Sequence, residues 1–156
     1  MAPSSRAPLW VIGWREKLSM PDLGIDEIKA KIDTGAQSSA LHAINIELFR
    51  RRGLDMVRFD VHPHQRDTRD TVHVEAELVD ERRIRSSSGQ VELRPVVLIA
   101  VKIRGRRWTT EFTLTGRNEM GFRVLLGRRA LSGRFLVDSE KSYLAGPPLE
   151  QSRKRK

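Results

Sequence analysis

Lys31-Ile32-Asp33-Thr34-Gly35-Ala36 is the stretch that decides the fold of this chain. It completes a segment, Ile28–Ile32, in which apolar and charged residues alternate as they do in a β-strand with one buried face. The strand runs directly into an aspartate, and the glycine two positions later permits a tight turn. An Asp-Thr-Gly tripeptide alone also occurs by chance, where the aspartate merely opens a turn.

A second element, Leu125-Leu126-Gly127, gives that tripeptide a more specific meaning. A strand ending in Asp-Thr/Ser-Gly, followed much later by an apolar-apolar-Gly element, is typical of one half of an aspartic-peptidase active site. Hydrolysis there needs two carboxylates that share a proton, one to activate water and one to protonate the substrate. The chain carries one copy of the signature and no internal repeat. The sequence therefore predicts a homodimer in which each subunit supplies Asp33.

The neighbours of Asp33 are compatible with this chemistry. Gly35 lets the backbone pass close to a partner loop, and its amide can donate to the carboxylate. Thr34 offers a hydroxyl for a hydrogen bond across the dimer axis. Ala36 offers no hydroxyl, and an aspartate without that donor holds its negative charge less well. We therefore predict a pH optimum closer to neutral than to strongly acid.

Short strands separated by Gly, Pro and charged turns account for the rest of the chain. Long helical periodicity is nearly absent, and at most one short helix is expected, at 128–131 after Gly127. We therefore predict an all-β protomer in the form of a closed β-barrel. The expected strands are 23–32, 44–48, 57–61, 72–79, 83–85, 91–93, 96–103, 107–114, 124–126, 135–138 and 142–144, with hairpin turns at 51–55 and 86–89.

Composition limits the classes of protein that this chain can represent. Its 156 residues can bury a real core, and the absence of cysteine excludes disulfides and thiolate metal sites. No apolar stretch approaches the roughly 20 residues that span a bilayer, and the first residues lack a secretory signal pattern. We expect a cytoplasmic protein with one domain at 9–146, a disordered N-terminal tail at 1–8 and a basic disordered tail at 147–156.

The net charge of +9 indicates attraction to polyanions, which are nucleic acid, an anionic membrane or acidic peptides. We expect no membrane partner, which leaves acidic peptides and nucleic acid. An arginine-rich surface without a specific ligand explains the charge equally well. Nucleic acid is the weaker of the two partners, because the strands lack the interleaved surface aromatics that stack on bases.

Four histidines, His42, His62, His64 and His73, are the candidate metal ligands. His62-Pro63-His64 lacks the helical spacing of a zinc-peptidase motif, and Pro63 forbids a helix there. These two residues are better explained as a surface loop. His73 fits a structural position in a strand, and His42 either lines a cleft or packs. No glycine-rich phosphate loop is present, so we expect neither a metal nor a nucleotide cofactor.

Several blocks of the chain, in order from about residue 11 to about residue 144, resemble the retropepsin-like bacterial family once labelled putative ATP-dependent zinc proteases. The matching positions are 13–16, 18, 21–25, 28–36, 39–43, 87–89, 92–97, 114, 117, 120, 125–131 and 135–138. The resemblance implies a retropepsin-like protomer that acts as a homodimeric aspartic peptidase, with Asp33 as the catalytic residue. It implies supporting roles for Thr34, Gly35, Ala36, Leu126, Gly127 and Arg128.

The resemblance also implies a flap that covers bound peptide and excludes water. The flap tip would be Ser86, Ser87, Ser88 and Gly89.

Members of this family are often associated with ATP-grasp ligases that add glutamates to a protein tail, which implies acidic or poly-glutamate substrates. Arg83, Arg85 and Arg94 flank the flap and are candidates to bind such a peptide, although flap-root charges that face solvent are an equal alternative. Residues 50–80 lengthen the chain relative to viral retropepsins and could occupy or reshape the cleft. The alternative function is therefore a catalytically silent peptide-binding module.

Overall fold

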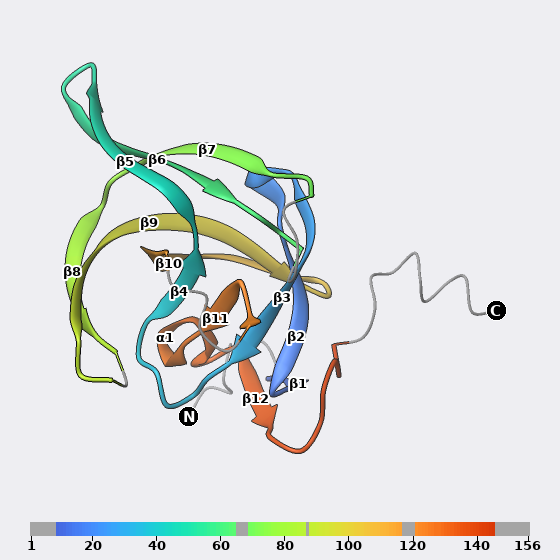
Figure 1. Cartoon of the computed structure of the whole chain (residues 1–156). Helices are drawn as coiled ribbons and strands as arrows, with labels where there is room; N and C mark the ends of the chain where they lie inside the picture. The colour runs from blue at the N-terminus through green and yellow to red at the C-terminus, as the bar shows by residue number, and fades with distance from the viewer. Residues whose placement is uncertain (1–8, 65–68, 87, 117–120, 146–156) are drawn as a thin grey trace, which may run out of the picture.

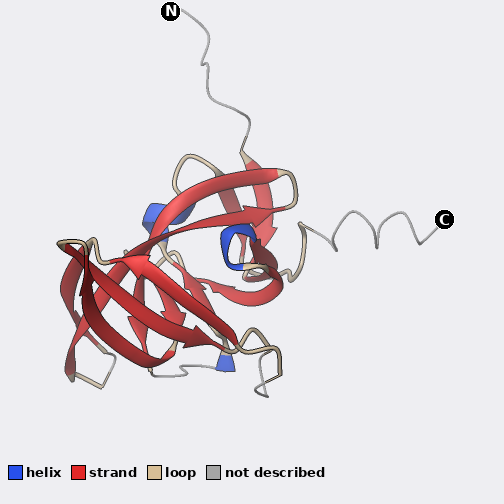
Figure 2. Cartoon of the chain, turned by 90° about the horizontal axis from the view of Figure 1, so that it is seen from above, coloured by secondary structure: helices blue, strands red, loops and turns tan. Residues whose placement is uncertain are grey.

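The computed structural model describes residues 9–64, 69–86, 88–116 and 121–145, which are mostly β-strands (Figure 1, Figure 2). The tails expected at 1–8 and 147–156 lie outside these residues, as do Ser87 of the expected flap tip and positions 117 and 120 of the family resemblance. The elements in chain order are β1 (Trp10–Gly13), β2 (Arg15–Met20), the 3₁₀ turn η1 (Pro21–Leu23), β3 (Ile25–Ile32), β4 (Ser39–His42), β5 (Ile44–Arg51), β6 (Leu54–Val61), β7 (Val72–Glu77), β8 (Asp80–Arg85), β9 (Val91–Ile103), β10 (Arg106–Thr115), β11 (Val124–Leu126), α1 (Arg128–Leu131) and β12 (Phe135–Asp138).

The main sheet wraps into a barrel-like ring. Its strand order is β10-β4-β11-β3-β2-β9-β8, and β9 also pairs with β10, so six strands return on themselves. The contact between β2 and β9 is the narrowest part of the ring, because the strands pair there only at Ser19 and Lys102. The all-β prediction is confirmed, and the one α-helix in the described residues is the short α1, directly after Gly127.

Strand β9 is long because it serves two neighbours in succession. It pairs with β8 from Val91 to Val96 and with β10 from Val96 to Ile103. The sequence predicted two separate strands at 91–93 and 96–103, and the structure joins them through Pro95. A proline inside a strand is tolerated where the strand switches from one neighbouring strand to another, because the N–H donor that proline lacks is not needed at that position.

Residues 44–77, which include most of the segment 50–80, form a separate three-stranded sheet, β5-β6-β7. The β5–β6 hairpin turns at Arg52 and Gly53, whose φ angles of 53° and 79° are both positive, as a two-residue type I′ turn requires. Figure 1 shows this hairpin projecting from the top left of the molecule, away from the ring.

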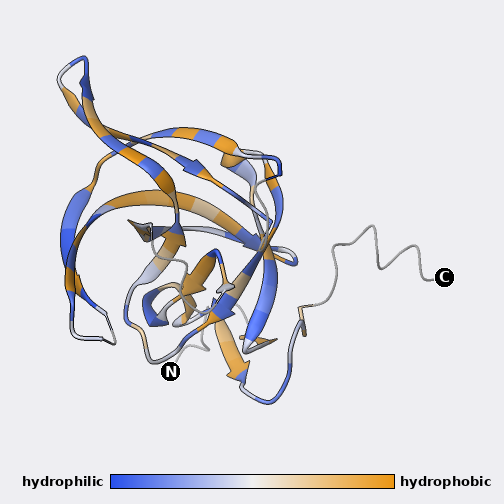
Figure 3. Ribbon diagram, viewed as in Figure 1, coloured by the Kyte–Doolittle hydropathy of each residue, from blue (hydrophilic) through white to orange (hydrophobic). Residues whose placement is uncertain are grey.

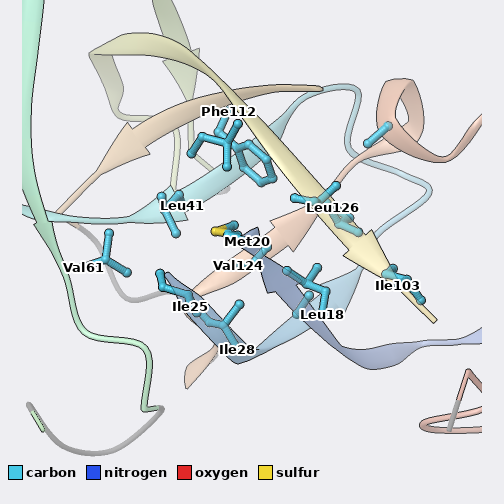
Figure 4. Close-up of a cluster of buried hydrophobic side chains, with 14 of the residues drawn as sticks. Leu18, Met20, Ile25, Ile28, Leu41, Val61, Ile103, Phe112, Val124 and Leu126 are labelled. Carbon is cyan, nitrogen blue, oxygen red and sulfur yellow. The ribbon is translucent and has the colours of Figure 1, made fainter. Parts of the chain in front are cut away.

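The core lies inside the ring and extends to the inner face of the β5-β6-β7 sheet, where Val61 belongs to the same cluster (Figure 4). Leu18, Met20, Ile28, Leu41 and Leu126 are at most 2% exposed. Each such side chain contributes roughly 2 kcal/mol by leaving water. Figure 3 shows the resulting alternation of apolar and polar positions along the strands.

The prediction of a strand at 142–144 is wrong. Tyr143 has a φ of 56°, and the backbone there forms bends and turns. The amides of Leu144 and Ala145 donate to the carboxylate of Glu16 at 2.8 and 3.3 Å. Glu16 is fully buried and also accepts from the Gly13 amide at 2.6 Å. A side-chain carboxylate therefore supplies the acceptors that a neighbouring strand would otherwise provide.

Strands β1, β2 and β4 were not predicted, because they are short and their sequence patterns are weak. No helix in the described part of the chain is long and apolar enough to cross a membrane.

Candidate functional site

The site is built around β11, which lies between β3 and β4. It runs parallel to β3, with Leu126 opposite Ile32, and antiparallel to β4, with Leu125 opposite Ala40. The amide of Asp33 continues the ladder by donating to the Leu126 carbonyl at 2.9 Å. This insertion brings the Asp33 turn and the Gly127 turn together from distant parts of the sequence.

The turn after β3 holds the Asp33 carboxylate from one side. The amides of Gly35 and Ala36 both donate to Asp33 Oδ1, at 3.0 and 3.2 Å. Thr34 and Gly35 are exposed and Asp33 is half-buried, so the turn lies at the surface of the single chain. A second copy of the chain can therefore reach it.

Gly127 supports this turn from behind. Its amide donates to Ser39 Oγ at 3.0 Å, and the amide of Arg128 donates to the Ala36 carbonyl at 2.7 Å. A Cβ atom at position 127 would lie 2.4 Å from the carbonyl oxygen of Ser38, a distance that no side chain can occupy without backbone movement. Glycine is therefore required here by close packing of two backbones.

Arg128 ties the two turns together through its side chain. Its Nη1 donates to the carbonyl oxygen of Thr34 at 3.1 Å, at an exposed position. The structure thus brings together all seven residues that the sequence placed at the active site, namely Asp33, Thr34, Gly35, Ala36, Leu126, Gly127 and Arg128. Their catalytic roles remain predictions.

The hairpin expected to act as a flap is formed by β8 and the first half of β9. Its tip is closed by a hydrogen bond from the Ser86 amide to the Gln90 carbonyl at 2.8 Å, and Ser86 Oγ lies 2.8 Å from Ser88 Oγ. Gly89 has a φ of 89°, which favours glycine at this turn.

The three arginines proposed to bind substrate differ in their surroundings. Arg83 is exposed on β8. Arg85 donates to the carbonyl of Gly89 at 3.1 Å and so contributes to its own turn. Arg94 is only 6% exposed and donates to Glu92 Oε1 at 2.6 Å. The structure does not gather these three guanidinium groups at one place.

Sequence reasoning missed two basic residues near the site, Lys31 and Arg123. Both line a small pocket, together with His42 and Arg94. Lys31 could have been found from the alternation of β3, because it lies two residues before Asp33. Arg123 gave no local signal, because its position depends on how β11 is inserted.

The histidines have separate partners. His64 Nε2 lies 2.7 Å from Asp70 Oδ2, His73 Nδ1 lies 2.6 Å from Asp60 Oδ1, and His62 Nδ1 lies 3.0 Å from Thr71 Oγ1. Hydrogen bonds from Asn45 and His73 lower the pKa of Asp60. Across the described ranges, no three His, Cys, Asp or Glu side chains gather as metal ligands.

Residues 11–148 match the model of the RimB-like family, described as retropepsin-like aspartic endopeptidase RimB. Curated relatives named probable alpha-L-glutamate ligase are similar to the chain. They include proteins of Shewanella halifaxensis, with 41% identity over 88% of this chain, and of Desulfotalea psychrophila, with 44% identity over 91%. The chain spans about 30% of the length of these relatives.

A solved structure has a similar fold. The crystal structure of a Legionella pneumophila protein of unknown function (DUF785) superposes with a TM-score of 0.74 and 30% identity. The match covers 87% of this chain and 98% of that protein.

Proposed function

The chain belongs to the RimB-like family of retropepsin-like aspartic endopeptidases, and we propose that it is itself an aspartic endopeptidase that works as a homodimer. The observation that supports this most directly is the fixed orientation of the Asp33 carboxylate, because one of its oxygens accepts two backbone hydrogen bonds. A catalytic carboxylate needs this kind of fixed orientation before substrate arrives.

The reaction requires a second carboxylate, and a second copy of the chain supplies it. Two Asp33 side chains that meet across a two-fold axis repel one another when both are ionised, so the pair shares one proton. The ionised member takes a proton from water, and the protonated member donates to the substrate carbonyl oxygen. The water oxygen attacks the carbonyl carbon and forms a tetrahedral intermediate. Its C–N bond then breaks, and the Asp33 that took the proton from water gives it to the leaving amine.

Acidic, glutamate-rich protein tails are the proposed substrates. The relatives named probable alpha-L-glutamate ligase contain a region like this chain within a polypeptide about three times as long. An enzyme that adds glutamate and a domain that removes it would act on the same tail. The net charge of +9 supports attraction to such a substrate.

The test is hydrolysis of a fluorogenic glutamate-rich peptide by the wild type and by Asp33→Asn, with products identified by mass spectrometry. We expect Asp33→Asn to abolish cleavage while its folding and subunit association stay unchanged. If the wild type cuts no more than Asp33→Asn and binds no transition-state analogue, the chain is instead the silent peptide-binding module.

A further inference from the structure

The hairpin of β8 and β9 leaves the ring of strands at one point. The backbone of β9 pairs with β10 from Ile103 to Val96, and its first half pairs with β8 instead. The pairing with β10 ends where Val96 lies opposite Thr113. Residues 80–95 therefore form an arm, and beyond this point its orientation relative to the ring depends on side chains.

One carboxylate joins the arm to the ring beyond the end of the backbone pairing. Oε1 of Glu92, on the arm, accepts a hydrogen bond from Thr115 Oγ1, on the ring, at 3.0 Å. The same oxygen accepts from Arg94 Nε at 2.6 Å. Thr115 and Arg94 are 5% and 6% exposed, so water competes little for either donor. Hydrogen bonds to an ionised acceptor in such surroundings are stronger than those between neutral groups.

Thr115 is a fixed point of attachment, because it belongs to the ring itself. It lies opposite His42 on β4, and its carbonyl oxygen accepts from the amide of Ala43 at 2.9 Å. Arg94 lies within the arm, opposite Arg82 on β8. The carboxylate of Glu92 therefore bridges a residue of the arm and a residue of the ring.

A second link between arm and ring is more exposed. Nη1 of Arg82, on the arm, lies 2.8 Å from Oε1 of Glu111 on β10, and the two side chains are 27% and 40% exposed. Ion pairs near the surface contribute little to stability because water and salt screen them. The bond between Thr115 and Glu92 is therefore the stronger of these two attachments.

Both strands of the arm border the region of the catalytic turn. Arg94 of β9 lines a small pocket together with Lys31, which lies two residues before Asp33. Arg82 of β8 lines a cavity of about 340 Å³ together with Ser38, which follows the turn of Asp33. A change in the orientation of the arm therefore changes the space beside this turn.

We propose that Glu92 is a positioning residue that fixes the arm to the ring through Thr115 and so holds the arm in the orientation that receives a peptide. This deepens the proposed function and rests on it for the identity of the ligand. Without the bond the arm populates other orientations. A peptide then binds only the fraction of chains whose arm has the receptive orientation, and its apparent affinity falls by that fraction.

Thr115 is the residue to change. Thr115→Val removes the hydroxyl donor and keeps a side chain of similar shape, while Thr115→Ser keeps the hydroxyl. Glu92→Ala would instead leave the buried guanidinium of Arg94 without this carboxylate, which destabilises a fold strongly. Because Thr115 is buried, thermal melting checks that its variants fold.

A distance within one chain tests the attachment without any peptide. The chain has no cysteine, so Ser88→Cys at the hairpin tip and Lys102→Cys on the ring can each carry a nitroxide label. Labelled chain is diluted with an excess of unlabelled chain, and double electron–electron resonance then reports the distance from arm to ring within one subunit. We expect Thr115→Val to broaden the distribution of this distance and Thr115→Ser to leave it unchanged.

Thr113→Val is the matched control, because it removes a hydroxyl on the same strand that donates to the carbonyl of Ser39 at 3.2 Å within the ring. It should leave the distance distribution unchanged. Glu111→Gln removes the more exposed link and should broaden the distribution less than Thr115→Val does.

Binding and kinetics test the consequence for the peptide. In a chain that carries Asp33→Asn, Thr115→Val should weaken binding of a fluorescein-labelled glutamate-rich peptide roughly tenfold, since a hydrogen bond to a charged group is lost from the receptive state. In the active chain it should raise KM by a similar factor and leave kcat nearly unchanged, because the interaction acts on binding. A general loss of structure would lower kcat as well.

The proposal is wrong if folded Thr115→Val keeps the wild-type distance distribution, if Glu111→Gln broadens it more, or if it broadens without weaker peptide binding. In each of these events, cleavage that Asp33→Asn abolishes would still support the peptidase. Conversely, a broadened distribution with weaker peptide binding, in a protein whose wild type cuts no peptide, would support the role of Glu92 and overturn the peptidase.

Discussion

At the scale of single residues, the site depends on which groups surround one carboxylate. Asp33 Oδ1 accepts from two backbone amides, and Ala36 contributes one of them without adding a side-chain donor. The motif predicted the contact from the Gly35 amide correctly, because it is made within three consecutive residues, but the contact from the Ala36 amide was not predicted. It could not reveal Lys31 and Arg123 as neighbours, since that requires the pairing of β3 with β11.

Ala36→Ser should shift the acid limb of the pH–rate profile to lower pH by roughly one unit, because a hydroxyl donor beside Asp33 favours the ionised pair. The measurement is kcat/KM for a glutamate-rich peptide as a function of pH. A profile identical to that of the wild type would show that the side chain at position 36 does not contact the carboxylate pair.

His42 should make the fold less stable in mild acid. Its pKa in the folded protein lies below the unfolded value of 6.5, owing to burial and then to Arg123, with a smaller contribution from His62. The unfolded chain therefore binds the proton more readily, and stability falls as the pH drops from 6.5 toward the folded pKa. Above 6.5 both states are neutral and this loss is absent.

Urea unfolding between about pH 7.5 and about pH 5.5 measures this dependence. His42→Gln should flatten it in that window. An equal pH dependence in both proteins would assign it to other groups.

At the scale of elements, the strands that the sequence predicted best are those with clear alternation or an apolar run, such as β10 and β11. The error at 142–144 has a different origin. Its apolar residues resemble a strand, but the amides of Leu144 and of the next residue, Ala145, bond to the side chain of Glu16, which lies far away in the sequence. Local pattern cannot identify an acceptor that only the folded chain supplies.

Glu16→Ala should destabilise the protein by about 3 kcal/mol or more, because it leaves the buried amides of Gly13 and Ala145 and the partly buried amide of Leu144 without their acceptor. Urea unfolding measures the change. Glu27→Ala is the control, since Glu27 lies in a surface ion pair of 3.9 Å with Lys17, and such pairs contribute under about 1 kcal/mol. Equal effects of the two substitutions would contradict the buried role of Glu16.

At the scale of the whole molecule, one chain carries a single Asp33 in a surface turn, so the proposed activity requires association of subunits. The ring of strands positions that turn, and the β5-β6-β7 sheet is added outside the ring. The barrel-like architecture was predictable from strand spacing. The switch of β9 from pairing with β8 to pairing with β10 could not be predicted in this way.

Adding an excess of Asp33→Asn protein to the wild type should suppress peptide cleavage, because most wild-type subunits then pair with a partner that lacks the carboxylate. Activity is measured after subunit exchange, and Glu16→Ala/Asp33→Asn, if it is unfolded, serves as a control that cannot pair. Cleavage that stays proportional to the amount of wild-type chain would contradict shared catalysis.

The insertion of β11 between β3 and β4 also affects when the protein can become active during its synthesis. A nascent chain that has left the ribosome only as far as β10 contains the Asp33 turn. It lacks the backbone contacts that Leu126 and the Gly127 turn make with that turn. Pairings between such distant segments form late and slowly. We therefore expect a nascent chain that ends before β11 to be unable to cleave peptides.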